Sequence, residues 1–267
     1  MTEPAPAPRA LQEEIVAAAA AIRAAPGAPA PRMALFQLSA VVGDWTRARS
    51  QLEMLVKLDP EYALFAHVYG RLLDAEVVRQ RVFAGREKPV ALGEPPAWLA
   101  MLAEALRLDG EGAPAEAREL RARARASAPA RAGSIGEERF AWLMDADPRL
   151  GPALEAVVEG QYRWLPLDRL EELRATAPGA MRDLVWQPVT FRLAAGRELG
   201  GFVPARYPDT EREAEDAVRL ARATRWIERD GEQCGLGQRM LASDLGDHAF
   251  LDIRRLRFDS EEAATDG

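Results

Sequence analysis

The stretch MALFQLSAVVGDWTRARSQLEMLVKLDP (33–60) decides the fold predicted for the first half of this chain. Its first part crowds apolar side chains onto one side of a helix that ends at Gly43: Leu35, Phe36, Leu38, Val41 and Val42. After a tight turn, apolar residues recur every three to four positions, at Ala48, Leu52, Leu55 and Leu58. Pro60 then disfavours further helix. The stretch therefore predicts a helical hairpin.

The spacing of this hairpin matches a tetratricopeptide unit, which is a helical hairpin of about 34 residues. The matching features are Gly-Asp-Trp at the turn, small Ala48 where the helices approach, large Leu52 and Leu55, and the terminal Pro60. A weaker echo occurs 69 residues later, in the same order: Gly112, Ala117, Ala124 and Pro129. Any pair of alanine-rich amphipathic helices produces similar spacing, so both interpretations of this second unit stay open.

Further helices are predicted around these two units. Leu11, Ile15 and Ile22, with alanines between them, predict a first amphipathic helix that the proline-rich linker 26–31 ends. Two more helices are expected at 62–83 and 97–108. Between them the segment 86–96 contains glycine and three prolines and is expected to cross the surface in extended form.

Beyond Gly133 the pattern changes from helical spacing to short apolar runs. Strands are predicted at 154–158, 162–165, 184–186, 189–193 and 250–254, with helices at 167–174 and 214–224. Short strands separated by glycine, proline and aspartate are typical of a small, strongly bent sheet or barrel. The expected fold class is α+β: tetratricopeptide-like helical hairpins followed by a small, barrel-like β-rich C-terminal domain.

The distribution of charge supports the same division of the chain. Residues 1–130 hold 16 acidic and 16 basic residues, whereas residues 131–267 hold 26 and 19, so the second half carries the net charge of −7. A nucleic-acid-binding protein needs a dominant positive field, and we expect no nucleic-acid partner. The expected parts are a disordered leader (1–10), a helical domain (11–130), a β-rich domain (131–258) and an acidic tail (259–267).

The sequence also indicates where the protein works. No apolar run approaches the roughly 18 residues of a membrane span. Residues 1–9 lack the basic and then apolar pattern of a signal peptide. Cys234 is the single cysteine, and a free thiol is tolerated best in a reducing compartment. We therefore expect a soluble, cytoplasmic protein with no membrane partner.

Residues suited to catalysis or metal binding are few. His67 and His248 lie in different halves, and we interpret His67 as a structural residue of a helix. Two histidines and one cysteine form no zinc-binding pattern. Asp145 and Asp147 are set closely enough to bind calcium or share a proton, but forming a turn is the favoured interpretation. We expect no enzyme activity, no cofactor and no metal.

Two other motifs have ordinary structural interpretations. The run Gly235-Leu236-Gly237-Gln238 lacks the third glycine and the lysine of a phosphate loop, which favours a turn with close backbone packing. An arginine series spreads around more than one face of a helix beside two glutamates: Arg118, Arg121, Arg123, Arg125 and Arg131. We interpret this series as a solvated surface, with nucleic-acid binding as the weaker alternative.

Large aromatic residues gather in the second half of the chain, at Trp142, Trp164, Trp186, Tyr207 and Trp226. Small sheets depend on large side chains for their core, so we expect these residues to fill the core of the β-rich half. Aromatic residues also anchor interfaces, so some of them lining an exposed groove is the alternative.

Seven phrases, taken in order, resemble the ImpE family, also called TagJ, of type VI secretion accessory proteins. They are LFQLSAVVGDW (35–45), VFAGREKPVALGEPPAWL (82–99), WLMDADPRLGP (142–152), DLVWQP (183–188), ARYPDTE (205–211), GLGQRMLASD (235–244) and LDIRRL (251–256). The resemblance implies a tetratricopeptide-like N-terminal half and a β-rich C-terminal half. It also implies binding to the N-terminal helix of TssB, the small subunit of the contractile sheath, and proximity to the sheath-disassembling ATPase ClpV.

The mechanism expected from this resemblance is helix-in-groove recognition without bond-breaking. An amphipathic TssB helix would lie on the concave apolar surface of stacked helical hairpins and modulate sheath assembly or ClpV-driven disassembly. The candidate contact residues, each with a place in the core as the alternative, are Phe36, Trp45, Phe65 and Tyr69. A general tetratricopeptide-type adaptor or chaperone for another secretion component or effector is the alternative function.

Overall fold

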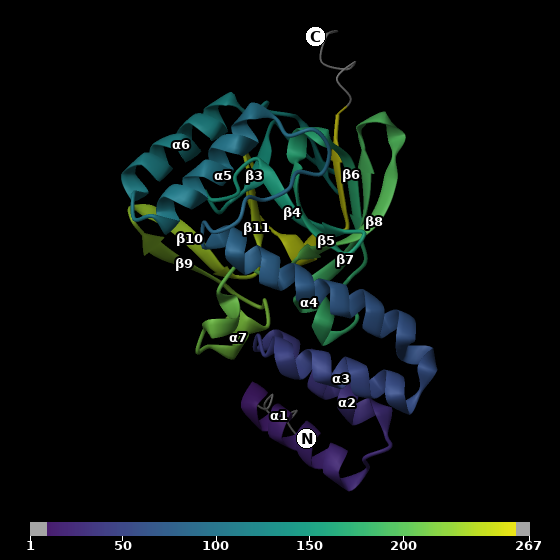
Figure 1. The fold of residues 1–267 in the computed structure, drawn as a ribbon. Helices are drawn as coiled ribbons and strands as arrows, with labels where there is room; N and C mark the ends of the chain where they lie inside the picture. The colour runs from purple at the N-terminus through teal and green to yellow at the C-terminus, as the bar shows by residue number, and fades with distance from the viewer. Residues whose placement is uncertain (1–9, 260–267) are drawn as a thin grey trace, which may run out of the picture.

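A helical half is followed along the chain by a β-rich half (Figure 1). The computed structural model describes residues 10–259, so residues 1–9 of the expected leader and 260–267 of the expected tail lie outside the described residues. The helices of the first half are α1 (Leu11–Ala24), α2 (Pro29–Val41), α3 (Trp45–Leu58), α4 (Ala63–Phe83), α5 (Ala97–Gly110) and α6 (Pro114–Ser127). Within 10–259, no helix is both long and apolar enough to span a membrane.

The predicted helical hairpin is formed by α2 and α3. At its turn Gly43 takes a left-handed conformation with φ of 72°, and the Asp44 carboxylate caps α3 by accepting a backbone hydrogen bond at 3.0 Å. Ala48 is fully buried, which lets the helices approach closely. The helices α5 and α6 form the second hairpin, in which Ala117 and Ala124 are fully buried. Both expected units are therefore present as helix pairs.

The long helix α4 lies between the first hairpin and the strands (Figure 1). The helices expected at 11–22, 62–83 and 97–108 agree with α1, α4 and α5 to within two residues. In the described part of the chain α3 packs on α4, whereas α5 packs mainly on α6. The two hairpins are therefore not consecutive members of one regular stack.

The strands of the described residues form three antiparallel sheets. The large sheet has the order β2 (Glu138–Phe140), β1 (Gly133–Ile135), β13 (Arg255–Phe258), β6 (Leu170–Ala175), β7 (Trp186–Leu193), β8 (Glu198–Pro204), β4 (Ala153–Val158) and β5 (Gln161–Pro166). A three-stranded sheet has the order β12 (Gly246–Ala249), β11 (Met240–Ser243) and β3 (Leu143–Asp145). A two-stranded ribbon consists of β10 (Glu232–Gly237) and β9 (Thr224–Arg229).

The large sheet is open, which corrects the expected barrel. Within 10–259 its edge strands β2 and β5 do not pair with each other. The edge of β5 is covered instead by the extended segment 86–96 that was predicted from its prolines. The Trp164 N–H donates to the Val90 carbonyl at 2.9 Å, and the Leu92 N–H donates to the Trp164 carbonyl at 2.8 Å. An edge protected by another part of the chain has no need to close on itself.

Several smaller expectations for the second half are corrected. β4 and β5 confirm the strands expected at 154–158 and 162–165, but the helix expected at 167–174 is a 3-10 turn followed by β6. The strand expected at 250–254 begins as a 3-10 turn, and β13 starts only at Arg255. The two strands expected at 184–186 and 189–193 are largely one strand, β7. The helix expected at 214–224 is reduced to the four residues of α7 (Asp216–Arg219).

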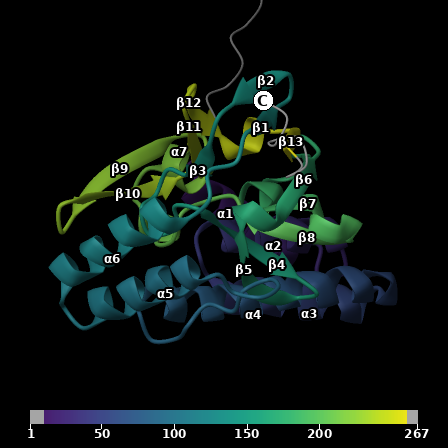
Figure 2. The same cartoon turned by 90° about the horizontal axis from the view of Figure 1, so that it is seen from above.

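Two large clusters of buried side chains and a third, small one form the core of the described residues. One belongs to the β-rich half and includes Leu165, Phe191 and Leu256. The other joins the helices to β4, β5 and β7, and it contains Trp164 and Trp186. These tryptophans are fully buried as expected, but in the core that the two halves share. In Figure 2, α4 and α5 lie along one edge of the molecule, and β1, β2 and β12 lie at the opposite edge.

Candidate functional site

A groove of about 370 Å³ opens between α4, the end of β4 and the middle of β8. Ten residues line it: His67, Val68, Arg71 and Leu72 of α4, Val157, Glu159 and Gly160 at the end of β4, and Gly200, Gly201 and Phe202 of β8. One helical turn before His67, on the same side of α4, Leu64 is 75% exposed. The groove therefore continues an apolar stripe on the surface of α4.

The rim of the groove is basic. Arg71 makes no ion pair or hydrogen bond with any described residue, while the rim carboxylate of Glu159 lies 3.6 Å from Arg197. A Cβ atom on Gly160 would lie 2.7 Å from Arg71 Nε, so this glycine makes room for the arginine. His67, interpreted from the sequence as structural, is exposed at the same rim. An apolar floor with an unpaired cation suits a polypeptide that brings a carboxylate.

The four aromatic residues predicted to contact a partner lie close together. The ring centroids of Phe36 and Phe65 are 5.7 Å apart, and those of Phe65 and Tyr69 are 4.4 Å apart. The Trp45 ring lies 6.0 Å from Trp186. Together they connect α2, α3 and α4 to β7.

These aromatic residues face inward to different extents. Phe36 is fully buried and Tyr69 is almost so, whereas Trp45 and Phe65 are half-buried. The Arg182 guanidinium lies 5.3 Å from the Phe65 ring centroid, and its Nε donates to the Tyr69 hydroxyl at 2.8 Å. In this arrangement Phe36 and Tyr69 serve packing. Their role in partner binding, like that of Trp45 and Phe65, stays a prediction.

A buried ion-pair network joins α4 to the strands. The Glu155 carboxylate of β4 accepts hydrogen bonds from Arg79 Nε at 2.6 Å and from the Tyr162 hydroxyl at 2.6 Å. Arg239 also donates to Glu155, and its other nitrogen donates to Asp145 of β3. All five side chains are buried. Since these groups come from both halves of the chain, the network fixes α4 against the sheet.

The pKa values in this network follow from burial and charge. Burial alone would raise the pKa of Glu155, but the positive charges of Arg79 and Arg239, with the hydrogen bonds, lower it to about 2. Burial raises the pKa of Glu76, and Arg79 together with the hydrogen bond from Trp186 only partly opposes it. Glu155 is therefore the anion on which the network depends.

The closely set Asp145 and Asp147 form the turn that the sequence favoured. Asp145 accepts the Asp147 N–H at 2.9 Å, and Asp147 accepts the Arg149 N–H at 2.9 Å. Arg149 also pairs with the Asp147 carboxylate at 2.6 Å, and the Gly235 N–H donates to it at 2.9 Å. Between residues 10 and 259, no cluster of three or more His, Cys, Asp or Glu side chains is arranged to hold a metal ion.

One hydroxyl–imidazole pair resembles the beginning of a catalytic dyad. Ser243 Oγ lies 2.9 Å from His248 Nε2 across the β11–β12 hairpin. The same hydroxyl accepts the Leu245 N–H at 3.0 Å and donates to the Gly246 carbonyl. Neither residue lines the groove or the polar pockets. These contacts give the pair a structural role in closing the hairpin.

The run 235–238 is a strand rather than the expected turn. Gly235 and Gly237 belong to β10. A Cβ atom on Gly235 would collide with the Tyr207 ring, and one on Gly237 would collide with the Ala223 carbonyl. The close backbone packing predicted for these glycines is therefore confirmed.

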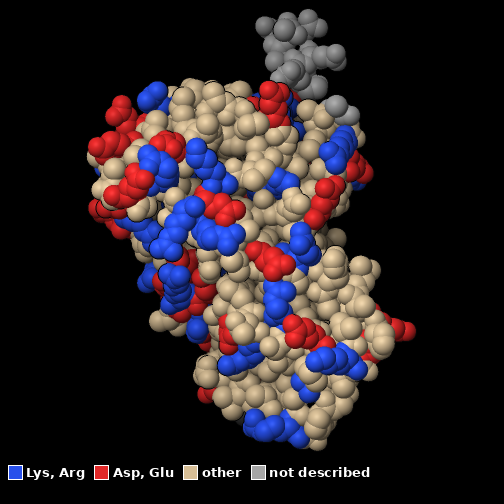
Figure 3. All heavy atoms as spheres, viewed as in Figure 1, with Lys and Arg blue, Asp and Glu red and all other residues tan. Residues whose placement is uncertain are grey.

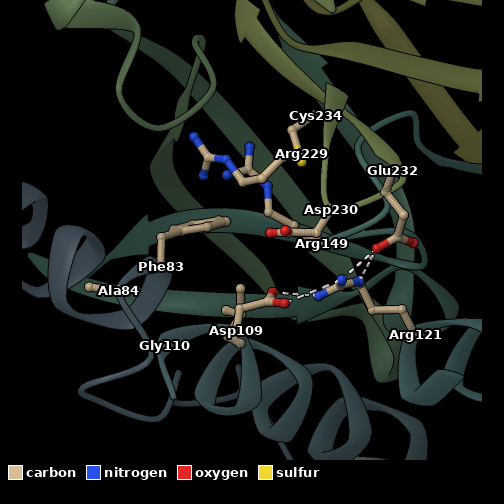
Figure 4. A pocket seen from close by; sticks show the side chains of 11 residues that line it. Phe83, Ala84, Asp109, Gly110, Arg121, Arg149, Arg229, Asp230, Glu232 and Cys234 are labelled. Carbon is tan, nitrogen blue, oxygen red and sulfur yellow. Dashed lines mark hydrogen bonds and ion pairs between the residues drawn. The ribbon is translucent and has the colours of Figure 1, made fainter. Parts of the chain in front are cut away.

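A polar pocket of about 160 Å³ lies between α4, α5, α6 and the β9–β10 ribbon (Figure 4). Figure 4 shows Arg121 placed between Asp109 of α5 and Glu232 of β10, with a 2.6 Å hydrogen bond to each. Arg121 is buried, which contradicts the expectation that this arginine series is solvated.

Acidic and basic side chains are intermixed on the face of the molecule shown in Figure 3.

A neighbouring polar pocket of about 260 Å³ is lined by charged side chains of both signs, including Glu76, Arg79 and Arg229. Glu76 is held there by the Trp186 Nε1–H at 2.8 Å and by Arg79 at 3.4 Å. Burial raises the pKa of Glu76, but its carboxylate already has these two partners. This arrangement is typical of a structural ion pair.

Cys234 lines the polar pocket of Figure 4 but is only 3% exposed. Burial raises the pKa of its thiol to about 11, against 9.0 for a free thiol, although Arg149 opposes the shift. We expect native protein to react with a disulfide reagent at pH 8 about a hundredfold more slowly than urea-unfolded protein, because the thiolate is the nucleophile. A Cys234→Ser variant controls for background. Rapid labelling of the native thiol would contradict this prediction.

Comparison with known proteins places the chain in a family. A family model described as ImpE protein matches residues 137–257. A relative from Pseudomonas aeruginosa, named type VI secretion system accessory component TagJ, is 43% identical over 255 residues, which cover 96% of this chain and 87% of the relative. The chain belongs to the ImpE family. This confirms the resemblance carried by the seven phrases.

The fold of this ImpE family member also occurs in a solved structure. A crystal structure of a protein from Vibrio parahaemolyticus superposes with a TM-score of 0.86 at 25% identity. The match covers 95% of this chain and 96% of that one. The arrangement of an N-terminal helical half and a C-terminal β-rich half is therefore shared with that protein.

Apart from one pair of glycines, residue patterns gave no indication of the groove in this ImpE family member. Arg71 and Leu64 are ordinary residues of an amphipathic helix, and only the three-dimensional structure shows that β8 runs past Arg71. One signal was present in the sequence: the pair Gly200-Gly201 lies inside a strand, where glycine often marks a close approach of another backbone.

Proposed function

We propose that this chain is a non-enzymatic, cytoplasmic accessory protein of a type VI secretion system that binds the N-terminal helix of the sheath subunit TssB. The observation that carries the proposal is the 43% identity, over 96% of the chain, to a protein named as a type VI secretion accessory component. By binding that helix the protein modulates sheath assembly or ClpV-driven disassembly. A ligand shifts only those states that it binds unequally, so the effect depends on which sheath state exposes the helix.

The structure offers this function a receptor surface. Helix-in-groove recognition requires an apolar concavity with anchors at helical spacing, and the groove beside α4 has an apolar floor. We also propose that the α2–α3 hairpin is tetratricopeptide-like. Its support is the left-handed Gly43 at the turn and the burial of Ala48, Leu52 and Leu55 at the positions of the repeat pattern.

A synthetic peptide of the TssB N-terminal helix, from the same bacterium, tests the proposed function. Titrated calorimetrically into the full chain, it is expected to bind with a dissociation constant of about 1–100 µM, or about −8 to −5.5 kcal/mol. A peptide of the same composition in scrambled order controls for non-specific apolar association. Absence of binding up to the high micromolar range would remove the proposed partner.

A general adaptor or chaperone for another secretion component or effector is the second candidate. It is favoured by the packing of α4 on the α2–α3 hairpin, since stacked helices serve as binding surfaces for many partners. Affinity purification from the native bacterium distinguishes the two functions. Recovery of an effector without sheath protein would favour the adaptor, whereas recovery of TssB favours the accessory role.

A further inference from the structure

We propose that the groove between α4 and β8 is the docking site for a partner's amphipathic α-helix, and that Arg71 pairs with a carboxylate beside that helix's apolar face. The inference rests on the proposed function and deepens it by assigning a site. The site differs from the aromatic residues suggested by the sequence, which lie mostly inside the shared core.

The geometry of α4 favours a helical occupant. Leu64, Val68 and Arg71 lie on one side of α4 at intervals of four and three residues, which forms a ridge along that side. Leu64 is 75% exposed, and Val68 is half-buried. The ridge of one helix packs into the groove of another when the side chains between them are apolar. The opposite wall, Gly200 of β8, has no atom within 4 Å of where a Cβ would lie, so a second backbone can approach it closely.

Charge selects among amphipathic helices. Arg71 has no acidic partner among the described residues, and the nearby Glu159 is paired with Arg197. Gly160 leaves room for the Arg71 side chain over the β4–β5 turn. An arginine without a counter-ion beside an apolar floor gains a charge-assisted hydrogen bond when the partner supplies a carboxylate. A partner helix with an aspartate or glutamate next to its aliphatic side chains therefore fits the groove.

An extended peptide added to the edge of β8 is the competing occupant. β4 pairs with β8 only at Gly201 and Phe202, which leaves Glu198–Gly200 without a strand on that side. A free edge of three residues gives an added strand few backbone hydrogen bonds. The α4 ridge, by contrast, runs through two helical turns. The surface available to a helix is thus the larger of the two.

The test uses the full chain and the TssB N-terminal helix peptide, with binding measured by calorimetry. Leu64→Asp and Arg71→Glu change exposed or half-buried side chains, and each is expected to weaken binding about tenfold or more. Val77→Asp on α4 and Leu245→Asp on the β11–β12 turn are matched controls, because both valine and leucine are exposed outside the groove. The controls are expected to bind within about twofold of wild type. Circular dichroism verifies that each variant is folded.

A charge swap tests the arginine directly. Peptides in which each acidic residue is replaced in turn by lysine are titrated into wild type and Arg71→Glu. One replacement is expected to weaken binding to wild type and to restore binding to Arg71→Glu, since a double-mutant cycle isolates a direct pair. If no replacement restores binding to Arg71→Glu, the pairing of Arg71 with the partner is overturned.

The remaining outcomes separate the site from the function. Wild-type affinity in both groove variants would overturn the site and leave TssB binding intact. No binding to wild type would overturn the proposed function, and this inference with it. Slowed hydrogen exchange of the amides of Glu198–Gly200 on adding peptide would show a strand at the β8 edge and overturn the helical occupant. Unchanged exchange there, with loss of binding in both groove variants, supports the proposal.

Discussion

Replacing Glu155 by glutamine is expected to lower the free energy of unfolding by about 3–5 kcal/mol, because it removes the carboxylate that two buried arginines share. Glutamine keeps the shape of the side chain, so the change removes charge with little change in volume. Its amide nitrogen is a donor, and it would face the donors of Arg79 and Arg239. Both arginines are buried, so little water replaces the lost carboxylate. Urea unfolding followed by circular dichroism measures the loss.

Glu172→Gln is the matched control for this prediction. Glu172 is also a buried strand glutamate among arginines, which are Arg174, Arg192, Arg255 and Arg257. The side chains of these arginines are 34–53% exposed, so they regain solvation when the carboxylate is lost. The control is expected to lose about 0–1 kcal/mol. Equal losses of unfolding free energy in the two variants would show that burial of the arginine partners does not determine the cost of removing the carboxylate.

The pH dependence gives a second measurement of the Glu155 charge. Its pKa is about 2 in the folded protein against 4.5 for a free glutamate. A lowered pKa contributes stability that is fully present above pH 4.5 and is lost as the pH falls from 4.5 toward 2. The difference in unfolding free energy between wild type and Glu155→Gln is therefore expected to be largest near pH 6 and to shrink below pH 4.5. A difference independent of pH would contradict the assigned charge.

The helical half was the part of the fold most open to prediction. Helical periodicity is local, and its ends are marked by local signals such as Gly43 and Pro60. For that reason the end of α3 was placed to the residue and α1, α4 and α5 to within two residues, whereas α2 begins at Pro29, inside the expected linker 26–31. The packing of α5 and α6 away from the first hairpin is not local. It depends on the extended segment 86–96, which pairs along the edge of β5, and the sequence does not indicate this pairing.

The strands were harder to place because their pairing overrides local preference. LEELRA (170–175) is composed of good helix formers, yet it is strand β6, since β7 and β13 bond to its two sides. Glu172 within it is buried, and arginines of the two neighbouring strands, β7 and β13, surround it. That environment is absent from the local sequence. Propensity is a weak guide wherever such tertiary contacts exist.

The buried charge network had no local signature either. Arg79 belongs to the helical half and Arg239 to the β-rich half, and only the fold brings both to Glu155. The predicted boundary near residue 130 does fall between α6 and β1. The shared core and this network nevertheless cross it, and residues of both parts contribute to each. We therefore expect the two halves to unfold in one transition rather than as independent domains.

Trp186 connects the β-rich half to the helical half through several contacts. It belongs to β7, yet its Nε1–H donates to Glu76 of α4 at 2.8 Å. Its ring centroid lies 6.0 Å from that of Trp45 and 6.2 Å from that of Tyr69. The indole is fully buried in the core shared by the halves. Truncating it opens a cavity at the junction and removes one of the two hydrogen-bond donors of the buried Glu76 carboxylate.

Trp186→Ala is therefore expected to lower the free energy of unfolding by about 3–5 kcal/mol, the range for loss of a large buried aromatic side chain. The loss of one of the two partners of the buried Glu76 carboxylate favours the upper part of that range. Trp142→Ala, at a half-buried tryptophan that is part of neither core cluster, is the control, with an expected loss of about 1 kcal/mol. Urea unfolding of both variants measures the losses. If Trp186→Ala lost no more than Trp142→Ala, the junction would contribute little to stability, and the helical half would be held to the sheet by other contacts.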